Sequence, residues 1–238
     1  MTNFFIQIFN TVFYQPLFNL LILFYLFSKD FGLAIILLTV LVRILFYPLT
    51  AKSIKSQKTL EGFQEKIKEI QAKYREDKER QAREMMELYR REKINPFSGF
   101  LPLLIQFPIL IALYQVFRKG LISEEMTNLY SFIPQPGQIN PFFFKFLDLT
   151  KPSLIFALLA GIFQFLQTKM TLPKAKKTKT QLEQFSNLIQ KQTLYFIPVF
   201  TVLLLWKLPT AISLYWLVTT IFSIVQQYLI LKKLKYVQ

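Results

Sequence analysis

The side chains most able to do chemistry in this sequence are polar residues set inside long apolar runs. Arg43 lies within the stretch TVLVRILFYPL, residues 39–49. If this stretch is one helix, Thr39 and Tyr47 share a face with Arg43, because residues four apart lie above one another. A permanently charged guanidinium in such a stretch needs an explanation, because placing a charge in an apolar environment is costly.

Further polar residues interrupt three later apolar runs. Gln106 lies near the middle of one run, a second group gathers near the end of the next, and a third group follows 3,4 spacing along one helical face. These residues are Gln106; Gln164, Gln167 and Thr168; and Ser213, Trp216, Thr220, Ser223 and Gln227. Polar groups at such depths normally face the interior of a helix bundle or water, and not lipid.

Composition excludes most kinds of catalysis. The chain has no cysteine and no histidine, which removes disulfides, thiolate nucleophiles and the commonest metal ligand and proton shuttle. A membrane enzyme would have to rely on Ser, Thr or Lys, and the lysines lie almost entirely outside the apolar runs. No Gly-rich phosphate loop is present. We therefore expect no catalytic residue, no metal, no cofactor and no enzyme activity.

The elements that must position these residues are apolar helices. Of the 238 residues, 53% are hydrophobic and 26 are Phe, more apolar surface than a soluble fold of this length can bury. A helix needs about 20 apolar residues to cross about 30 Å of hydrocarbon. The runs predict an all-α membrane protein with five transmembrane helices, over residues 31–50, 96–118, 153–170, 193–208 and 209–231.

Charge sets the orientation of these helices. The net charge of +15 could indicate nucleic acid, but in a membrane protein Lys and Arg first mark the loops that stay in the cytoplasm. Segments 51–95, 171–192 and the tail 232–238 are basic, whereas 119–152 is nearly balanced. We therefore place the basic segments and the C-terminus in the cytoplasm, and 119–152 outside.

Residues 1–30 allow two interpretations. Gln7, Asn10, Gln15, Pro16 and Asn19 interrupt the apolar pattern without adding charge. These breaks favour an amphipathic helix in the outer membrane interface over a sixth span. No basic region precedes the apolar part, so we do not expect a cleaved signal peptide. The first span then begins outside, and the N-terminus is extracytoplasmic.

The charged segment 51–95 has two narrow apolar seams. Apolar residues recur at 3,4 spacing from Leu60 to Tyr74 and from Ala82 to Tyr89, and the charged REDKER lies between them. This pattern predicts a cytoplasmic helical hairpin. Its charges either only solvate the exposed faces or help to receive a client. Asn95 then resembles an N-cap, with Pro96 opening the next span.

Arg43 also allows two interpretations. It could be an anchor whose guanidinium snorkels to the membrane surface. No acidic residue lies inside any expected span to pair with it, and a closed, dry bundle would leave a buried charge uncompensated. An aqueous pocket open to the cytoplasm avoids that penalty. It also leaves the charge available to a group from outside the protein.

Three segments resemble one known family, the YidC-type membrane protein insertases with their mitochondrial and chloroplast relatives. They are GLAIILLTVLVRILFYPLTAKSIKS, EMMELYRREKINPFSGFLPLLIQFPILIALYQVF and LPTAISLYWLVTTIFSIVQQYLI. The resemblance runs from about Tyr14 to Leu231. The arginine, the NP-x3-LPLLIQ-x-P run and the LYW run occur in the family's order and at its separations.

The resemblance implies five spans around a hydrophilic groove that is open to the cytoplasm and to lipid. Carried over by position, the groove residues are Arg43, Gln106, Gln167 and Trp216, with Gln164 as the substitute for Gln167. The polar neighbours that would complete this groove are Thr39, Gln164, Thr220, Ser223 and Gln227.

The implied function is insertion and chaperoning of membrane proteins at a bacterial-type plasma membrane. A client's polar leading segment would enter the groove, and its apolar segment would pass into the bilayer. The partners implied are nascent membrane proteins, the lipid bilayer, a ribosome and a Sec-type translocon, and no specific nucleic-acid sequence. The short tail argues against tail-mediated ribosome docking. The rival function is a small-solute or anion transporter or channel that uses Arg43, for which we would expect repeat symmetry or paired broken helices.

Overall fold

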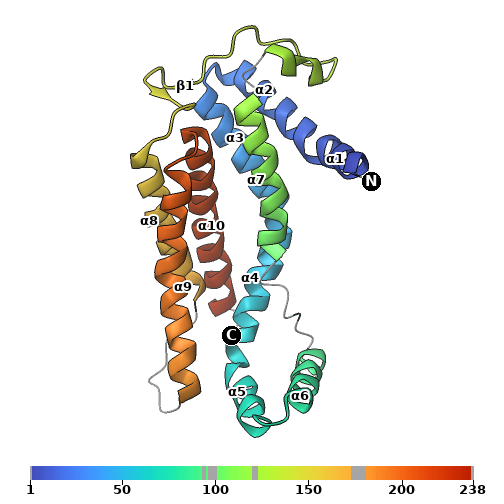
Figure 1. Ribbon diagram of the computed structural model, residues 1–238, viewed down its shortest axis with the longest axis vertical. Helices are drawn as coiled ribbons and strands as arrows, with labels where there is room; N and C mark the ends of the chain where they lie inside the picture. Colours follow the sequence, from blue (N-terminus) through green and yellow to red (C-terminus); the bar gives the residue numbers. More distant parts are fainter. Residues whose placement is uncertain (1, 93–94, 96–100, 120–122, 173–180, 237–238) are drawn as a thin grey trace. The chain divides into compact units, whose positions relative to one another are not determined.

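The computed structural model describes residues 2–92, 95, 101–119, 123–172 and 181–236. Helices account for most of these residues (Figure 1), which confirms the prediction of a largely helical protein. In chain order the elements are α1 Thr2–Phe9, the π-helix η1 Asn10–Tyr14, α2 Gln15–Ser28, α3 Phe31–Leu45, α4 Tyr47–Gly62, α5 Gln64–Lys73, α6 Lys78–Arg91, α7 Leu101–Lys119, the 3-10 helix η3 Ser123–Asn128, β1 Phe142–Phe143, β2 Leu147–Asp148, α8 Leu154–Thr171, α9 Gln181–Leu205 and α10 Thr210–Tyr236.

The chain divides into two compact units. The first contains Met1–Leu45 and Gln106–Val225, and the second contains Phe46–Ile105 and Gln226–Gln238. The first unit has the larger apolar core, with Phe18, Ile35, Leu113, Leu205 and Tyr215 each at most 2% exposed.

Helices α8 and α9 pack antiparallel in the first unit. The α-carbon of Gly161 lies so close to the side chain of Val202 that no larger residue fits without movement, and the rings of Phe165 and Tyr195 stack at 6.0 Å. Glycine permits this approach because it has no Cβ. The contact holds the apolar faces of the two helices together.

Helix α3 has defined ends. α2 stops at Lys29, which adopts a left-handed conformation with φ of 56° and donates its N–H to the Tyr25 carbonyl. The Asp30 carboxylate then accepts the Leu33 N–H at 2.9 Å, as an N-cap does. At the other end the helix predicted over 31–50 is interrupted at Phe46. Pro48 explains the break, because proline has no N–H for the helical ladder and its ring clashes with the preceding turn.

Helix length and hydropathy identify the membrane-spanning candidates. Among the described residues these are Phe4–Ser28, Leu154–Thr171 and Thr210–Leu234, with a fourth if the bent pair Phe31–Leu45 and Tyr47–Gly62 counts as one span. The segment Lys191–Leu205 is a shorter apolar helix. The N-terminal segment qualifies because its helix is unbroken from Thr2 to Ser28, the polar residues and Pro16 included.

Other expected boundaries shift. α9 begins at Gln181, so the second half of the loop predicted over 171–192 is helical, because polar residues can continue a helix beyond its apolar part. The segment predicted as a plain loop over 119–152 contains η3 and a two-stranded antiparallel hairpin. The expected role of Pro96 as the first residue of a span falls outside the described residues.

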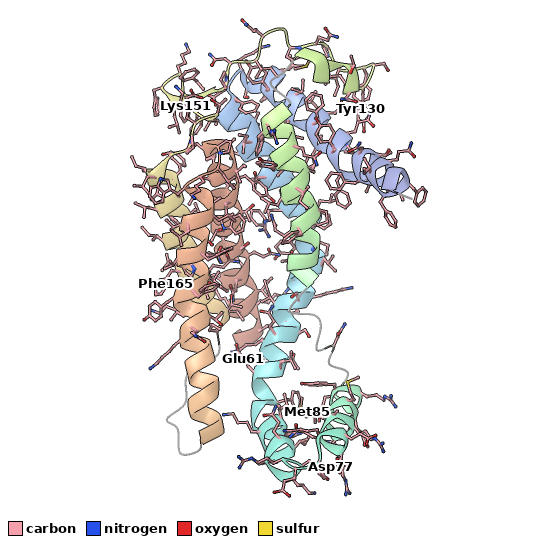
Figure 2. All side chains as sticks on the ribbon, in the orientation of Figure 1. Glu61, Asp77, Met85, Tyr130, Lys151 and Phe165 are labelled. Atoms are coloured by element: carbon pink, nitrogen blue, oxygen red, sulfur yellow. The ribbon has the colours of Figure 1, made fainter. Side chains whose placement is uncertain are left out.

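The second unit contains an antiparallel pair of helices, α5 and α6. Gln81 Nε2 donates to the Gln71 carbonyl at 2.9 Å, and the Arg80 guanidinium lies 5.2 Å from the centre of the Tyr74 ring. Asp77 caps α6 by accepting the Arg80 N–H at 2.9 Å, and Figure 2 labels Asp77 at the turn. The ion pairs of these helices, Lys66 with Glu92 and Arg83 with Glu79, are exposed, and exposed ion pairs contribute little stability.

Candidate functional site

Arg43 lies in the last turn of α3 and is half-buried. Its Nη2 donates a hydrogen bond to Oε1 of Gln106 on α7 at 3.4 Å. Nearer the other end of α3, the Phe31 ring meets the Phe117 ring edge-on at 6.3 Å, so α3 and α7 run antiparallel. The two residues singled out in separate apolar runs are therefore neighbours in space.

Gln106 connects this arginine to a third helix. Its Nε2 donates to the hydroxyl oxygen of Tyr215 on α10 at 2.5 Å. The Tyr215 side chain is only 2% exposed, so its position is fixed by packing. Arg43, Gln106 and Tyr215 form a continuous hydrogen-bonded group, which we call the arginine cluster.

The arginine cluster carries an uncompensated positive charge. Within the described chain, no ion pair includes Arg43, and its hydrogen-bond partner is the neutral amide of Gln106. A neutral amide orients the guanidinium but does not cancel its charge. The guanidinium has five N–H donors, so it retains donors for an anionic group.

A second polar group joins α8 to α10. Trp216 Nε1 donates to Oε1 of Gln164 at 3.0 Å, and the Thr168 hydroxyl donates to the Gln164 carbonyl at 2.8 Å. We call Gln164, Thr168 and Trp216 the tryptophan cluster. Trp216 and Gln164 are both half-buried. The family resemblance assigned Gln167 to the groove with Gln164 as its substitute, and the structure brings Gln164 to the indole.

The hydroxyl residues of the expected site bond to their own helices. Thr39 donates to the Ile35 carbonyl at 2.6 Å, Thr220 to the Trp216 carbonyl at 2.8 Å and Ser223 to the Thr219 carbonyl at 2.8 Å. Such bonds to the preceding turn satisfy a hydroxyl without a neighbouring helix. These three residues are buried and supply polarity more than directional recognition.

The remaining expected residues are Gln167, Gln227 and Tyr47. Gln167 is half-buried, and its carbonyl accepts the Thr171 hydroxyl. Gln227 is buried but belongs to the second unit. Tyr47 begins α4, whereas Arg43 is in α3. The single helical face expected through Thr39, Arg43 and Tyr47 is therefore not formed.

Sequence reasoning missed Tyr215. The residue lies in the run SLYWLV beside Trp216 and reads as part of the apolar pattern. A signal was available, because a buried tyrosine hydroxyl usually finds a hydrogen-bond partner. Tyr215 is that partner for Gln106.

Comparison with known proteins decides the family. The family model described as 60Kd inner membrane protein matches residues 23–237.

The chain belongs to the 60Kd inner membrane protein family.

Curated relatives of this family carry the name membrane protein insertase YidC. The relative from Fusobacterium nucleatum is 33% identical over 204 residues, covering 86% of this chain and 87% of its own length. The relative from Francisella philomiragia is 36% identical over 203 residues, and that match covers 84% of this chain but 32% of the relative. This chain therefore spans nearly all of one relative and about a third of the other.

A solved structure shows the same fold. The crystal structure of an active YidC insertase with its first transmembrane domain resolved superposes with a TM-score of 0.57 at 25% identity, covering 92% of this chain and 46% of that chain. With the family match, this similarity and the apolar helices identify a bacterial multi-pass membrane protein. The resemblance seen in the sequence is confirmed.

Proposed function

We propose that this chain is a membrane protein insertase in which Arg43 attracts the acidic leading segment of a client. The observation that carries the proposal is that Arg43 is oriented by a neutral amide, and no carboxylate of the described chain pairs with it. The names of the relatives support an insertase over an anion channel or transporter. Client proteins and the bilayer are then its partners, with the ribosome and a Sec-type translocon as further ones.

The proposed architecture has five spans around a groove open to the cytoplasm. The spans over 31–50, 96–118, 153–170, 193–208 and 209–231 correspond to the helix pair α3 and α4, to α7, α8, α9 and α10. Residues 1–30 lie in the outer interface, 51–95 form the cytoplasmic hairpin, and the N-terminus is outside with the C-terminus in the cytoplasm. The basic bias of 51–95, 171–192 and 232–238 supports this orientation.

In this mechanism the protein supplies an environment and no bond-making group. The arginine cluster and the tryptophan cluster replace part of the hydration of the client's polar segment, which lowers the cost of bringing that segment into the bilayer. The client's apolar segment then partitions into lipid, where each square ångström of apolar surface removed from water contributes roughly 25 cal/mol. No covalent step is needed, and we expect no cofactor and no metal.

The sharpest test introduces a carboxylate beside Arg43 by substitution of Gln106. Gln106→Glu places an acidic group where the amide now accepts from Arg43 at 3.4 Å, so it neutralises the charge with almost no change of shape. Gln106→Met is the matched control, because it removes the hydrogen bond and leaves the charge. In proteoliposomes we expect Gln106→Glu to insert a client with an acidic leader much less than Gln106→Met does.

A second client separates charge from folding defects. The same client with a neutralised leader should be inserted equally by Gln106→Glu and Gln106→Met. Equal insertion of the acidic client by the two variants would show that Arg43 does not act by its charge. Anion flux through liposomes that contain the unaltered protein, without client insertion, would favour the channel instead.

A further inference from the structure

The hairpin β1–β2 exposes aromatic side chains at its tip. Phe142, Phe144 and Phe146 are 36%, 56% and 77% exposed, and Lys145 between the last two is also exposed. The rings of Phe144 and Phe146 lie 6.5 Å apart and nearly parallel, with an interplanar angle of 15°. The tip is therefore a small apolar surface with a positive charge at its centre.

The backbone of the tip is strained. Phe144 and Lys145 have φ of 48° and 66°, in the left-handed region that residues other than Gly, Asn and Asp rarely adopt. Hairpin turns with two such positions favour Asn-Gly or Gly-Gly. A bulky aromatic residue and a lysine here cost stability, and strain of this kind is concentrated where side chains have a function.

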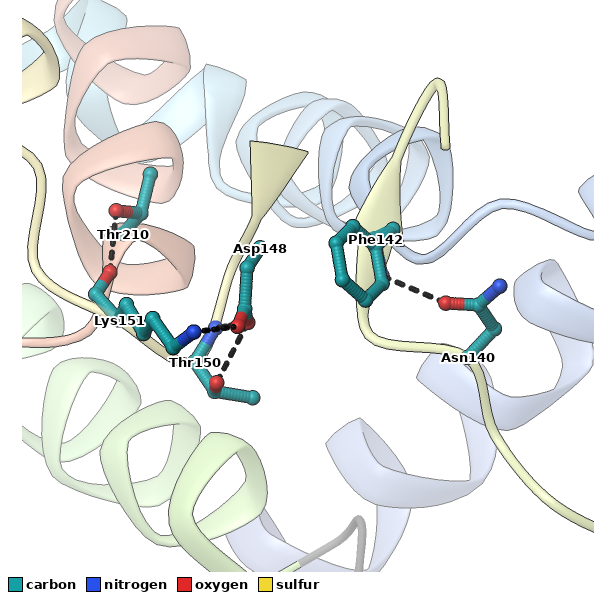
Figure 3. Close-up of polar contacts among 6 residues, drawn as sticks. All are labelled: Asn140, Phe142, Asp148, Thr150, Lys151 and Thr210. Carbon is teal, nitrogen blue, oxygen red and sulfur yellow. Dashed lines mark hydrogen bonds and ion pairs between the residues drawn. The ribbon is translucent and has the colours of Figure 1, made fainter. Parts of the chain in front are cut away.

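The base of the hairpin is fixed to the start of α10. The Thr210 N–H and hydroxyl both donate to the Lys151 carbonyl, at 2.9 and 2.5 Å, and the Ala211 N–H donates to the Leu149 carbonyl at 3.0 Å. Figure 3 shows the contact between Thr210 and Lys151, with Asp148 bonded to Lys151 and Thr150. The Thr150 hydroxyl, aided by Lys151, lowers the pKa of the Asp148 carboxyl, so this carboxylate keeps its charge to a lower pH than an ordinary aspartate.

The hairpin is also fixed to the start of α3. The Phe144 N–H donates to Oδ2 of Asp30 at 2.6 Å, while Oδ1 of the same carboxylate caps α3 through Leu33. The Phe143 ring packs directly against the α-carbon of Gly32. One ring of the run therefore faces the protein, and its neighbours are left exposed.

These attachments connect the tip to the first residues of candidate membrane spans. Two candidate spans, α8 and α10, begin beside the hairpin. The first residues of α8, Leu154 and Ile155, are 48% and 69% exposed, as expected of a helix that enters lipid at this point. A rigid hairpin attached at that level cannot extend far from the lipid headgroups.

We propose that Phe144, Lys145 and Phe146 form a lipid-binding tip that inserts into the membrane interface and favours acidic phospholipids. Aromatic rings are enriched at this depth in membrane proteins, and a nearby lysine is attracted to acidic headgroups. This contact would hold the outer ends of α3, α8 and α10 at a fixed level in the bilayer. The lipid-binding tip is separate from the arginine cluster. Only its assignment to the outer leaflet rests on the proposed topology.

The absence of cysteine from the chain allows a direct measurement of depth. Single variants Phe146→Cys, Gln135→Cys and Ile155→Cys are spin-labelled in the full chain and reconstituted without other proteins. Vesicles contain phosphatidylcholine with or without phosphatidylglycerol. Power saturation with oxygen and with a water-soluble nickel chelate then reports lipid and water contact. Gln135 is an exposed polar residue of the same loop, and Ile155 is the lipid-facing reference.

We expect the Phe146→Cys label to resemble Ile155→Cys, with high oxygen and several-fold lower nickel accessibility than Gln135→Cys. Adding Lys145→Glu to Phe146→Cys should raise nickel accessibility in vesicles with phosphatidylglycerol and much less in phosphatidylcholine alone. Nickel accessibility equal to that of Gln135→Cys would overturn the proposal. A label shielded from both reagents would also overturn it, because the tip would then pack against protein.

Discussion

The Trp216 indole donates its Nε1 hydrogen to Oε1 of Gln164 at 3.0 Å. The pair joins α10 to α8 through side chains, at a level where both residues are half-buried. Gln164 is held in turn through the Thr168 hydroxyl, which lies one helical turn further along α8. This hydrogen bond orients the indole toward α8.

This pair should show energetic coupling. In a double-mutant cycle of Trp216→Phe and Gln164→Leu, we expect an interaction energy of about 0.6 kcal/mol and not above about 1.7 kcal/mol, the range for hydrogen bonds between membrane helices. Unfolding in mild detergent with increasing dodecyl sulfate measures it. Strict additivity of the two substitutions would show that the hydrogen bond contributes nothing to stability.

Arg43 should act mainly through its charge. Arg43→Lys keeps the charge but loses the planar guanidinium, whereas Arg43→Ala removes both. In proteoliposomes, Arg43→Lys should largely retain insertion of an acidic client, and Arg43→Ala should lose it. The difference in insertion between the two variants should shrink as the salt concentration rises. The exposed Arg118 provides the control Arg118→Ala. If Arg43→Ala folds in the membrane and inserts the acidic client as well as the unaltered protein does, Arg43 is an anchor.

Gly32 should not tolerate a side chain. A methyl group on its α-carbon would overlap the Phe143 ring, and overpacking of this kind typically costs about 1–3 kcal/mol. Gly32→Ala should therefore lower the melting temperature in detergent. Gly62→Ala is the matched control, because nothing lies within 4 Å of the new methyl group and alanine favours helix by up to about 1 kcal/mol. Equal melting temperatures for the two variants would contradict the packing of Phe143 on α3.

The turn between α5 and α6 should face the cytoplasm and open readily. A single Asp77→Cys should react with a membrane-impermeant maleimide in inverted vesicles and not in intact cells. Amide exchange at the turn should be the fastest in this helix pair, because most of its contacts are exposed. Labelling of Asp77→Cys only from outside would reverse the proposed topology.

The N-terminal helix should lie in the outer interface. The segment Phe4–Ser28 is long and apolar enough to cross a membrane, but its uncharged polar residues Gln7, Asn10 and Gln15 favour the interface. Cysteines placed at Ile6 and Val12 should both react from outside with an impermeant reagent. A tag at Met1 that is digestible only from the cytoplasm would show that this helix is a sixth span.

The sequence was enough to predict a largely helical membrane protein and its family, but not the contacts between its helices. Apolar runs and the spacing of Arg43, Gln106 and Trp216 are local patterns, and such patterns define membrane helices well. The choice of Gln164 over Gln167 as the partner of Trp216 depends on how α8 is rotated. That rotation is set by contacts such as Gly161 with Val202, between residues far apart in sequence.

The break at Phe46 and the hairpin β1–β2 were missed because their local sequence signals are weak. Pro48 interrupts the helix at Phe46, but its neighbours are apolar, and a hydropathy pattern does not distinguish one bent helix from a straight one. The strands β1 and β2 have two residues each and lack the Asn-Gly turn that usually marks a hairpin. Their attachment to Asp30 and Thr210 comes from distant parts of the chain.

The inward-bonded hydroxyls of Thr39, Thr220 and Ser223 have a kinetic consequence. Each hydroxyl is buried and donates its hydrogen within its own helix, so a client has no direct access to these three groups. Hydrogen bonds to a client would then come from the half-buried residues of the arginine cluster and the tryptophan cluster. Because so few hydrogen bonds would have to break when a client leaves, we expect its residence time to be short.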